Sequence, residues 1–144
     1  MSSDVIEHDG VLTDALRAKL IEAAREAQKR AYAPYSLFAV GAAVLDENLR
    51  IHSGCNVENA AYPEGMCAEA GALSAMVLAG GKRVVAVAIV GKGPISITPC
   101  GGCRQKLREF ATANLQILVG DDESLRETFT LEQLLPRSFG PEHL

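Results

Sequence analysis

Three cysteines and one glutamate in two short motifs could support metal-dependent chemistry. The first motif is Cys67-Ala68-Glu69, and the second is the stretch 99–103, Pro-Cys-Gly-Gly-Cys, in which Cys100 follows Cys67 by 33 residues. Three thiolates can hold a zinc ion and leave its fourth position open to water. The spacing therefore predicts an open, catalytic zinc site with Cys67, Cys100 and Cys103 as ligands. Glu69 is close enough in sequence to carry a proton for that water.

A closed, structural zinc site is the alternative, because such sites usually have four protein ligands. Cys55 would be the fourth ligand, although a strand end better suits it as a small buried residue. His8, His52 and His143 show no ligand spacing and are interpreted as surface or loop histidines. For Glu69, the alternative is a first-turn carboxylate that only interacts with the helix dipole.

Length, charge and composition limit the kind of partner. A chain of 144 residues suits one domain, spanning residues 1–144. The net charge of −4 and the lack of a Lys/Arg block argue against nucleic acid as a partner and favour a small, neutral substrate. No apolar run approaches the ~20 residues that cross a bilayer, which argues against a membrane association. The polar, acidic first ten residues do not resemble a secretory signal, so we expect a cytoplasmic protein with reduced thiols.

Apolar spacing and breaker residues predict one mixed sheet with helices on its faces. Helices are expected over 13–31, with Thr13 as the cap, over 67–79 and over 100–110, and a short helix or turn over 131–135. Strands are expected over 38–45, 50–55, 84–90 and 115–119. The first two strands should form a hairpin, and 84–90 should be a central parallel strand. Helix 67–79 is apolar nearly all round, which is typical of a buried helix.

Both cysteine motifs lie at the start of an expected helix. Cys67 begins one helix, and Cys100 and Cys103 begin the other. Free backbone N–H groups and the positive end of the helix dipole favour thiolate there. The sequence therefore predicts that two helix starts direct three sulfurs to one point.

The motifs resemble those of the cytidine deaminase family, small zinc enzymes that act on free nucleosides. The zinc-deaminase signature is a ligand-x-Glu segment followed by Pro-Cys-x-x-Cys, with a three-cysteine variant. Other segments match in the family's order and extend the resemblance over residues 31–139. They are Ala33-Pro34-Tyr35-Ser36, Phe38, Val40-Gly41-Ala42, Asn56-Val57-Glu58-Asn59-Ala60, Cys103-Arg104-Gln105, Leu134-Leu135-Pro136 and Phe139.

The resemblance implies an α/β fold with three layers, α-β-α, and a mixed sheet of about five strands. It also implies one zinc ion per subunit, bound by Cys67, Cys100 and Cys103. Glu69 would be the proton shuttle.

The resemblance further implies the substrate contacts. Asn56 and Glu58 would hydrogen-bond the ribose, and Phe38 would pack against the pyrimidine. Phe139 would complete the pocket of a neighbouring subunit, in a homotetramer with shared active sites. From the residues alone, Asn56 and Glu58 can project to one side of an extended segment and bind a hydroxyl. The alternative is a polar loop that satisfies its own hydrogen bonds.

Two positions depart from the family's pattern. Ala70 stands where the family usually has arginine after Cys-x-Glu. Zinc with three thiolates is a net anion, and the usual arginine would withdraw charge from a thiolate. Without it, helix dipoles, backbone N–H groups and Arg104 must contribute more. The loop 62–65, Tyr-Pro-Glu-Gly, also differs from the commonest family loop.

The expected reaction is hydrolytic deamination of cytidine and 2′-deoxycytidine to uridine and 2′-deoxyuridine plus ammonia, in pyrimidine salvage. Zinc would lower the pKa of its water from ~15.7 toward ~7 and supply hydroxide, which attacks C4 of the ring. Glu69 would carry the proton to N3 and then donate a proton to the departing ammonia.

Three alternatives stay open at this point. The first is a deaminase of another aminopyrimidine nucleoside, such as an antibiotic. The second is a deaminase of polynucleotides, which the acidic composition and the lack of a basic, aromatic-rich stripe oppose. The third is a non-catalytic domain with structural zinc.

Overall fold

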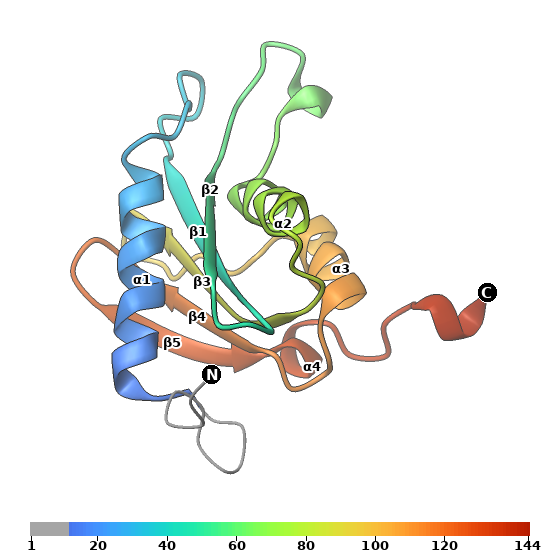
Figure 1. Ribbon diagram of the computed structural model, residues 1–144. Coiled ribbons are helices and arrows are strands. Elements are labelled where there is room, and N and C mark those ends of the chain that lie inside the picture. The colour runs from blue at the N-terminus through green and yellow to red at the C-terminus, as the bar shows by residue number, and fades with distance from the viewer. Residues whose placement is uncertain (1–11) are drawn as a thin grey trace.

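The computed structural model describes residues 12–144 and contains one sheet with helices on both sides (Figure 1). The strand order is β2-β1-β3-β4-β5. The helices and strands in chain order are α1 Asp14–Gln28, β1 Val40–Asp46, β2 Ile51–Cys55, η2 Tyr62–Glu64, α2 Ala68–Leu78, β3 Val84–Gly91, α3 Gly101–Phe110, β4 Gln116–Gly120, β5 Leu125–Thr130, α4 Leu131–Leu134 and η3 Pro141–His143. Within this range no helix is long and apolar enough to cross a membrane.

The sheet is mixed, as predicted. Strands β1 and β2 form the expected antiparallel hairpin, and β1 also pairs antiparallel with β3. Strand β3 pairs parallel with β4, and β4 pairs antiparallel with β5. The predicted central strand over 84–90 is therefore confirmed as β3. Its predicted parallel pairing holds for β4 only, because β3 runs antiparallel to β1.

Side chains along the central strands point alternately to the two faces of the sheet, and this divides the hydrophobic core between two layers of helices. Ala42 and Val44 of β1 belong to the cluster packed under α2 and α3, whereas Ala43 and Leu45 belong to the cluster packed under α1. Successive strand residues point to opposite faces, so a strand buried on both faces reads as a continuous apolar run. This arrangement is the three-layer α-β-α architecture that was expected.

Helix α1 begins where its cap predicts. The Thr13 hydroxyl accepts a hydrogen bond from the Leu16 N–H at 3.3 Å, which satisfies one free donor of the first turn. The helix ends at Gln28 rather than Ala31, and Gly41 lies directly beneath its last turn. A Cβ on Gly41 would lie 1.9 Å from the Ala24 carbonyl oxygen, so only glycine permits this close packing.

Three expectations from the sequence are corrected. Strand β5 was not among the strands expected, because its residues are mostly exposed or half-buried and give no apolar run. Helix α2 is not buried all round, since Leu78 is 91% exposed and Val77 is 51% exposed. His52 is not a surface or loop histidine: it lies in β2 with a side chain 10% exposed, and its Nε2 is 2.8 Å from Asp46 Oδ2. His143 does lie near the exposed carboxyl end, and His8 lies outside the described residues.

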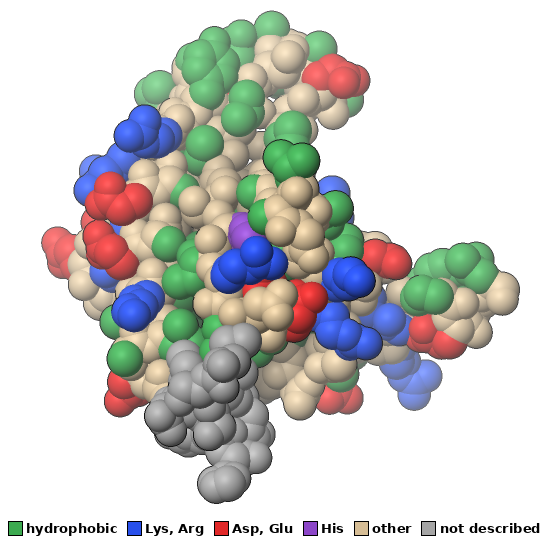
Figure 2. All heavy atoms as spheres, in the orientation of Figure 1, with side chains coloured by type: hydrophobic (Ala, Val, Ile, Leu, Met, Phe, Trp, Pro, Cys, Tyr) green, Lys and Arg blue, Asp and Glu red, His purple; other side chains and the backbone are tan. Residues whose placement is uncertain are grey.

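The surface of the molecule fits the charge pattern of the sequence. On the face shown in Figure 2, acidic and basic side chains are interspersed, and no broad basic field is seen. Hydrophobic side chains gather at the top of this view, over the loop between β2 and α2. Tyr62 and Met66 of that loop are 77% and 48% exposed.

Candidate zinc and nucleoside site

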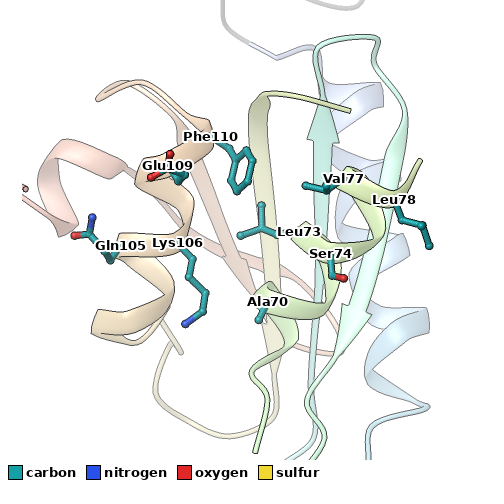
Figure 3. Close-up of a pocket in the computed structure, with 9 residues that line it drawn as sticks. All are labelled: Ala70, Leu73, Ser74, Val77, Leu78, Gln105, Lys106, Glu109 and Phe110. Carbon is teal, nitrogen blue, oxygen red and sulfur yellow. The ribbon is translucent and has the colours of Figure 1, made fainter. Parts of the chain in front are cut away.

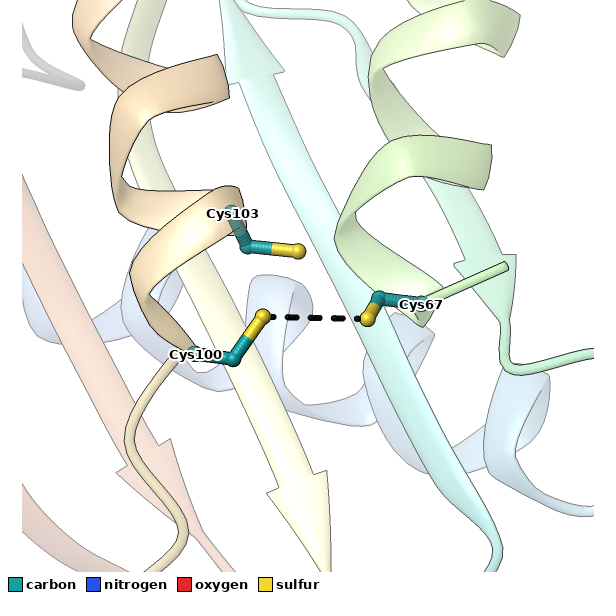
Figure 4. A group of neighbouring side chains, drawn as sticks. All are labelled: Cys67, Cys100 and Cys103. Atoms are coloured by element: carbon teal, nitrogen blue, oxygen red, sulfur yellow. Dashed lines mark hydrogen bonds between the residues drawn. The ribbon is translucent and has the colours of Figure 1, made fainter. Parts of the chain in front are cut away.

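The sulfurs of Cys67, Cys100 and Cys103 meet between the first turns of α2 and α3 (Figure 4). Cys67 is the N-cap residue of α2 and Cys100 is the N-cap residue of α3, while Cys103 lies in the first turn of α3. The three sulfurs lie within 4.8 Å of one another, and Cys67 Sγ is 3.8 Å from Cys100 Sγ. The predicted convergence of two helix starts is therefore confirmed.

The spacing of the sulfurs fits a tetrahedral zinc ion. Bonds of ~2.3 Å at tetrahedral angles put two sulfurs about 3.8 Å apart. Among the described residues, this group has no fourth His, Cys, Asp or Glu ligand, and Cys55 is not part of it. The donor set is therefore three soft thiolates with one position left over, which is the pattern of a catalytic rather than a structural zinc site.

Close backbone packing sets the position of α2 and hence of Cys67. A Cβ on Gly54 of β2 would lie 2.4 Å from the Ala72 nitrogen and 2.6 Å from the Ala68 carbonyl oxygen. Gly71 of α2 faces Gly54 at this crossing, because a Cβ on Gly71 would lie 3.5 Å from the Gly54 Cα. Glycine at position 54 therefore lets helix and strand approach closely, which a larger residue there would prevent.

Arg104 fixes the loop that carries Cys100. Its guanidinium donates to the Pro99 carbonyl at 2.7 Å, to the Thr98 hydroxyl at 3.0 Å and to the Leu134 carbonyl at 2.7 Å. A planar guanidinium with several donors suits such a three-way contact. Arg104 therefore positions the second motif, and its donors are directed to oxygens rather than to sulfur.

The three thiols differ in their acidity. Burial raises the pKa of Cys103 far above its ordinary value, and the nearby Glu69 raises it further. Burial also raises the pKa of Cys67, with Cys100 and Glu69 adding to the effect. For Cys100, burial raises the pKa, but hydrogen bonds from Cys103 and Cys67 outweigh it and lower the pKa overall. Gathering three thiolates here is therefore unfavourable unless a cation is present.

Glu69 is buried beside the cysteines. It is 4% exposed and lines the same cavity as Cys67 and Cys100. Burial raises the pKa of Glu69, against weaker lowering by its own backbone N–H, the Cys103 thiol and the Lys106 ammonium. A raised pKa brings the charged and neutral forms of a carboxyl group closer in free energy, which suits a group that takes up and releases protons.

A cavity of about 350 Å³ opens beside the cysteines. Its volume lies within the range of small-molecule sites. The lining residues come from the start of β1, the loop between β2 and α2, the first turn of α2, and the loop before α3. They are Val40, Asn56, Val57, Glu58, Tyr62, Gly65, Met66, Cys67, Ala68, Glu69, Ile97, Thr98 and Cys100.

Asn56 and Glu58 both line this cavity, and both also bind the protein's own backbone. Asn56 Oδ1 accepts from the Val40 N–H and Asn56 Nδ2 donates to the Phe38 carbonyl, each at 2.9 Å. The Glu58 carboxylate accepts from the Tyr35 N–H at 2.9 Å and from the hydroxyl and N–H of Ser36, and these bonds lower its pKa. The two side chains are thus fixed in place by their loops while they face the cavity.

The two phenylalanines lie in different surroundings. Phe38 is not among the lining residues; its ring packs at the end of β3, 3.1 Å from where a Cβ on Gly91 would lie. Phe139 is 57% exposed and stacks on His143 in the carboxyl-terminal segment, which extends away from the body of the molecule in Figure 1.

Sequence reasoning missed part of the cavity wall. Tyr62, Ile97 and Thr98 line it, yet Tyr62 lies in the three-residue helix η2 and the other two lie in an irregular loop, and segments this short or irregular show no periodicity that signals burial. The one signal in the sequence was an aromatic residue, Tyr62, in a loop that departs from the family's pattern. Tyr62 packs edge-on against Tyr35, with ring centroids 6.3 Å apart.

Known proteins share both the motifs and the fold. The family model for the cytidine and deoxycytidylate deaminase zinc-binding region matches residues 15–119. A cytidine deaminase of Sporosarcina psychrophila is 41% identical over 88% of this chain and 93% of its own length. One from Mycobacterium tuberculosis is 43% identical over 84% of this chain and 87% of its own.

Solved structures agree with the sequence relatives. The cytidine deaminase from Burkholderia pseudomallei superposes with a TM-score of 0.79 at 40% identity, covering 85% of this chain and 98% of that one. The Mycobacterium tuberculosis structure gives 0.77 at 39% identity, covering 89% and 98%. With the three-cysteine group, Glu69 and the three-layer sheet, these matches show that the chain belongs to the cytidine deaminase family.

Proposed function

We propose that this protein hydrolyses cytidine and 2′-deoxycytidine to uridine and 2′-deoxyuridine with release of ammonia, as a pyrimidine salvage enzyme of the cytoplasm. One observation carries the proposal: three cysteine sulfurs and a buried glutamate meet beside one cavity of about 350 Å³. Support comes from relatives named cytidine deaminases that are about 40% identical over most of this chain.

The chain's own residues divide the chemistry between them. Cys67, Cys100 and Cys103 would hold zinc, which when bound lowers the pKa of a water at its open position. Glu69 would accept one proton from the attacking water and give it to N3 of the pyrimidine. It would then take the second proton from the oxygen now bound to C4 and give it to the departing amino group, which leaves as ammonia. Its burial limits competition from bulk water for these transfers.

Asn56 and Glu58 are the proposed ribose contacts. Each lines the cavity and keeps hydrogen-bonding capacity beyond its backbone contacts, since an amide has two N–H donors and a carboxylate about four acceptor sites. Because backbone groups of residues 35–40 already fix their orientations, binding a hydroxyl costs little side-chain entropy. Phe38 is the proposed packing partner of the pyrimidine.

We also propose a homotetramer in which Phe139 completes the pocket of a neighbouring subunit. Support comes from apolar surface that a single copy leaves uncovered, including Val77, Leu78 and Phe139. A cavity of about 720 Å³ lies between α2 and α3, with Val77, Leu73 and Phe110 along its walls (Figure 3). Light scattering should give four times the chain mass of 15.3 kDa, and Leu78→Glu should lower it. A monomer in the wild-type protein would contradict this assembly.

The activity is tested with purified protein by ultraviolet assay of cytidine and by metal analysis of the same sample. We expect turnover and one zinc ion per chain. Cys67→Ala should lose both. Cys55→Ser is the matched control and should keep both, because Cys55 lies outside the sulfur group. Zinc loss in Cys55→Ser, together with no turnover in the wild type, would instead indicate a closed structural site.

A further inference from the structure

The wall of the cavity that carries Asn56 and Glu58 is built by two segments hydrogen-bonded side by side. The Tyr32 N–H donates to the Asn56 carbonyl at 3.0 Å, and the Glu58 N–H donates to the Tyr32 carbonyl at 2.8 Å. The Asn56 side chain binds the Phe38 carbonyl and the Val40 N–H, each at 2.9 Å. These contacts fix the backbone on both sides of the Glu58 side chain.

The two oxygens of the Glu58 carboxylate are used differently. Oε1 accepts from the Tyr35 N–H at 2.9 Å and from the Ser36 N–H at 3.1 Å. Within the described residues, the Ser36 hydroxyl is the one donor to Oε2. A carboxylate oxygen has about two acceptor sites, so Oε1 is fully used and Oε2 keeps one. Because Glu58 lines the cavity, Oε2 is the oxygen that can accept from a hydroxyl bound there.

The Ser36 hydroxyl that holds Oε2 is itself oriented by the backbone. Its oxygen accepts from the Phe38 N–H at 3.0 Å. An ionised carboxylate only accepts, so the single proton of the hydroxyl is directed to Glu58. Phe38 N–H, Ser36 O–H and Glu58 Oε2 therefore form one chain of hydrogen bonds, in which each bond strengthens the next.

Leu37 shows how firmly this turn is held. Its φ of 59° lies in the left-handed region, which leucine rarely adopts, and it is 84% exposed, so burial does not compensate for the strain. Contacts on both sides hold it: the Leu37 N–H donates to the Ala33 carbonyl at 3.0 Å, and Phe38 is bound by Ser36 and Asn56. Strained backbone concentrates at functional sites, where surrounding contacts determine it.

We propose that Ser36 is a positioning residue that directs Oε2 of Glu58 toward a hydroxyl of the bound ribose. It acts through Glu58 and does not touch the reacting atoms. The proposal rests on the proposed function, in which Glu58 binds the ribose. Ser36 therefore affects the selection of substrates that carry ribose hydroxyls, and it does not affect the hydrolytic step at the cysteines and Glu69.

The test compares cytidine with 2′,3′-dideoxycytidine, which lacks both hydroxyls on the sugar ring, by ultraviolet assay of the purified enzyme. Wild type should prefer cytidine in kcat/KM. Ser36→Ala should raise the KM for cytidine about three- to tenfold, the effect of one charge-assisted hydrogen bond, with kcat within about twofold of wild type. The KM for the dideoxynucleoside should stay unchanged, because Phe38 keeps its contact with Asn56 in this variant.

Two further variants separate the hydroxyl from general effects on the fold. Ser36→Thr keeps a hydroxyl at this position and should retain the wild-type KM for cytidine. Ser53→Ala is the matched control, because Ser53 is an exposed serine of β2 that pairs with Ala43, a residue of the core under α1. It should leave the KM for both nucleosides unchanged. Thermal melts confirm that each variant is folded.

The outcomes distinguish the proposal from the function on which it rests. If Ser36→Ala keeps the wild-type preference for cytidine, or if it weakens both nucleosides equally, Ser36 does not position Glu58 for the ribose. A loss in Ser36→Thr as large as in Ser36→Ala would also contradict the proposal. A wild-type enzyme that does not distinguish the two nucleosides, or that has no turnover, would instead overturn the proposed function.

Discussion

Asp46 and Glu69 are both buried carboxylates, with 0% and 4% of their surface exposed, yet their surroundings are opposite. Asp46 accepts hydrogen bonds from the N–H groups of Asn48 and Arg50 and from His52, at 2.8 to 3.0 Å, and pairs with the Arg50 side chain. Burial raises the pKa of Asp46, but these bonds outweigh it and the pKa is lowered. Burial of Glu69 is not offset in this way, and its pKa is raised.

The contrast separates a structural carboxylate from a reactive one. A ring of donors stabilises the charge of Asp46 and closes the β1–β2 turn, so this group stays ionised at neutral pH. Glu69 has few donors and faces a cavity, so its charged and neutral forms are closer in free energy. Burial alone therefore says little about a carboxylate; the donors around it decide whether it supports the fold or moves protons.

The largest expected effect is on catalysis. Glu69→Gln should lower kcat for cytidine by about a thousandfold or more, as loss of a general acid-base does. It should leave zinc content unchanged and the melting temperature equal or higher, because a neutral amide is easier to bury than a carboxylate. Steady-state kinetics, metal analysis and thermal melts check this. A clear loss of stability would show that Glu69 is structural like Asp46.

Removing the structural carboxylate, Asp46, should affect the stability of the fold rather than catalysis. Asp46→Ala should lower the free energy of unfolding by about 3 kcal/mol, because it leaves His52, Arg50 and two backbone N–H groups without their acceptor. The kcat of the remaining folded enzyme should be unchanged. Urea titration and activity per folded molecule measure the two effects. A large fall in kcat would show that Asp46, like Glu69, contributes to catalysis.

Gly54 links the two regions, since it lies in β2 with His52 and packs against α2 near Glu69. Gly54→Ala should destabilise the protein by about 2 kcal/mol, because its methyl group would collide with the backbone of α2. Displacement of α2 should also weaken zinc retention. Urea titration and zinc transfer to a chelator measure the two effects. Gly101→Ala is the control, because a Cβ at that position meets open space, and it should change neither property.

The smallest effect is a pH dependence. A carboxylate whose pKa is lowered in the folded state contributes stability above its unfolded pKa of ~3.9 and loses it as the pH falls through the folded value. The difference in the free energy of unfolding between wild type and Asp46→Asn (the stability gap) should therefore be constant above about pH 5 and shrink toward pH 3. Urea titrations at several pH values measure the gap. A gap that widens in acid would mean that Asp46 is neutral when folded.

The elements and the metal ligands could largely be predicted from local sequence. Thr13 marks the start of α1, and the cysteine spacing identifies the sulfur group, because caps and ligands are short-range signals. The partnership of His52 with Asp46 could not be predicted, since it depends on the β1–β2 turn and register. Strand β5 was missed because Leu125 is 41% exposed and the strand lacks an apolar run.

The cavity-lining residues that lie outside the recognised motifs were equally hard to predict. Ile97 and Thr98 line it from a loop that is held by long-range contacts, since Arg104 binds Thr98 and Ile97 packs beside Gly91. The exposed side of α2 was also missed, since an all-apolar helix does not reveal which face a single copy leaves uncovered. Long-range contacts of this kind are fixed by packing between elements rather than by any local pattern.

The contact from Arg104 to the Leu134 carbonyl has a consequence for the order of synthesis. Leu134 is made 30 residues after Arg104, whereas all three cysteines precede Arg104 in the chain. A nascent chain can therefore carry every sulfur and still lack the acceptor that completes the anchoring of its second motif. Translation through α4 is therefore part of building the metal site, and the finished geometry requires the chain at least as far as Leu134.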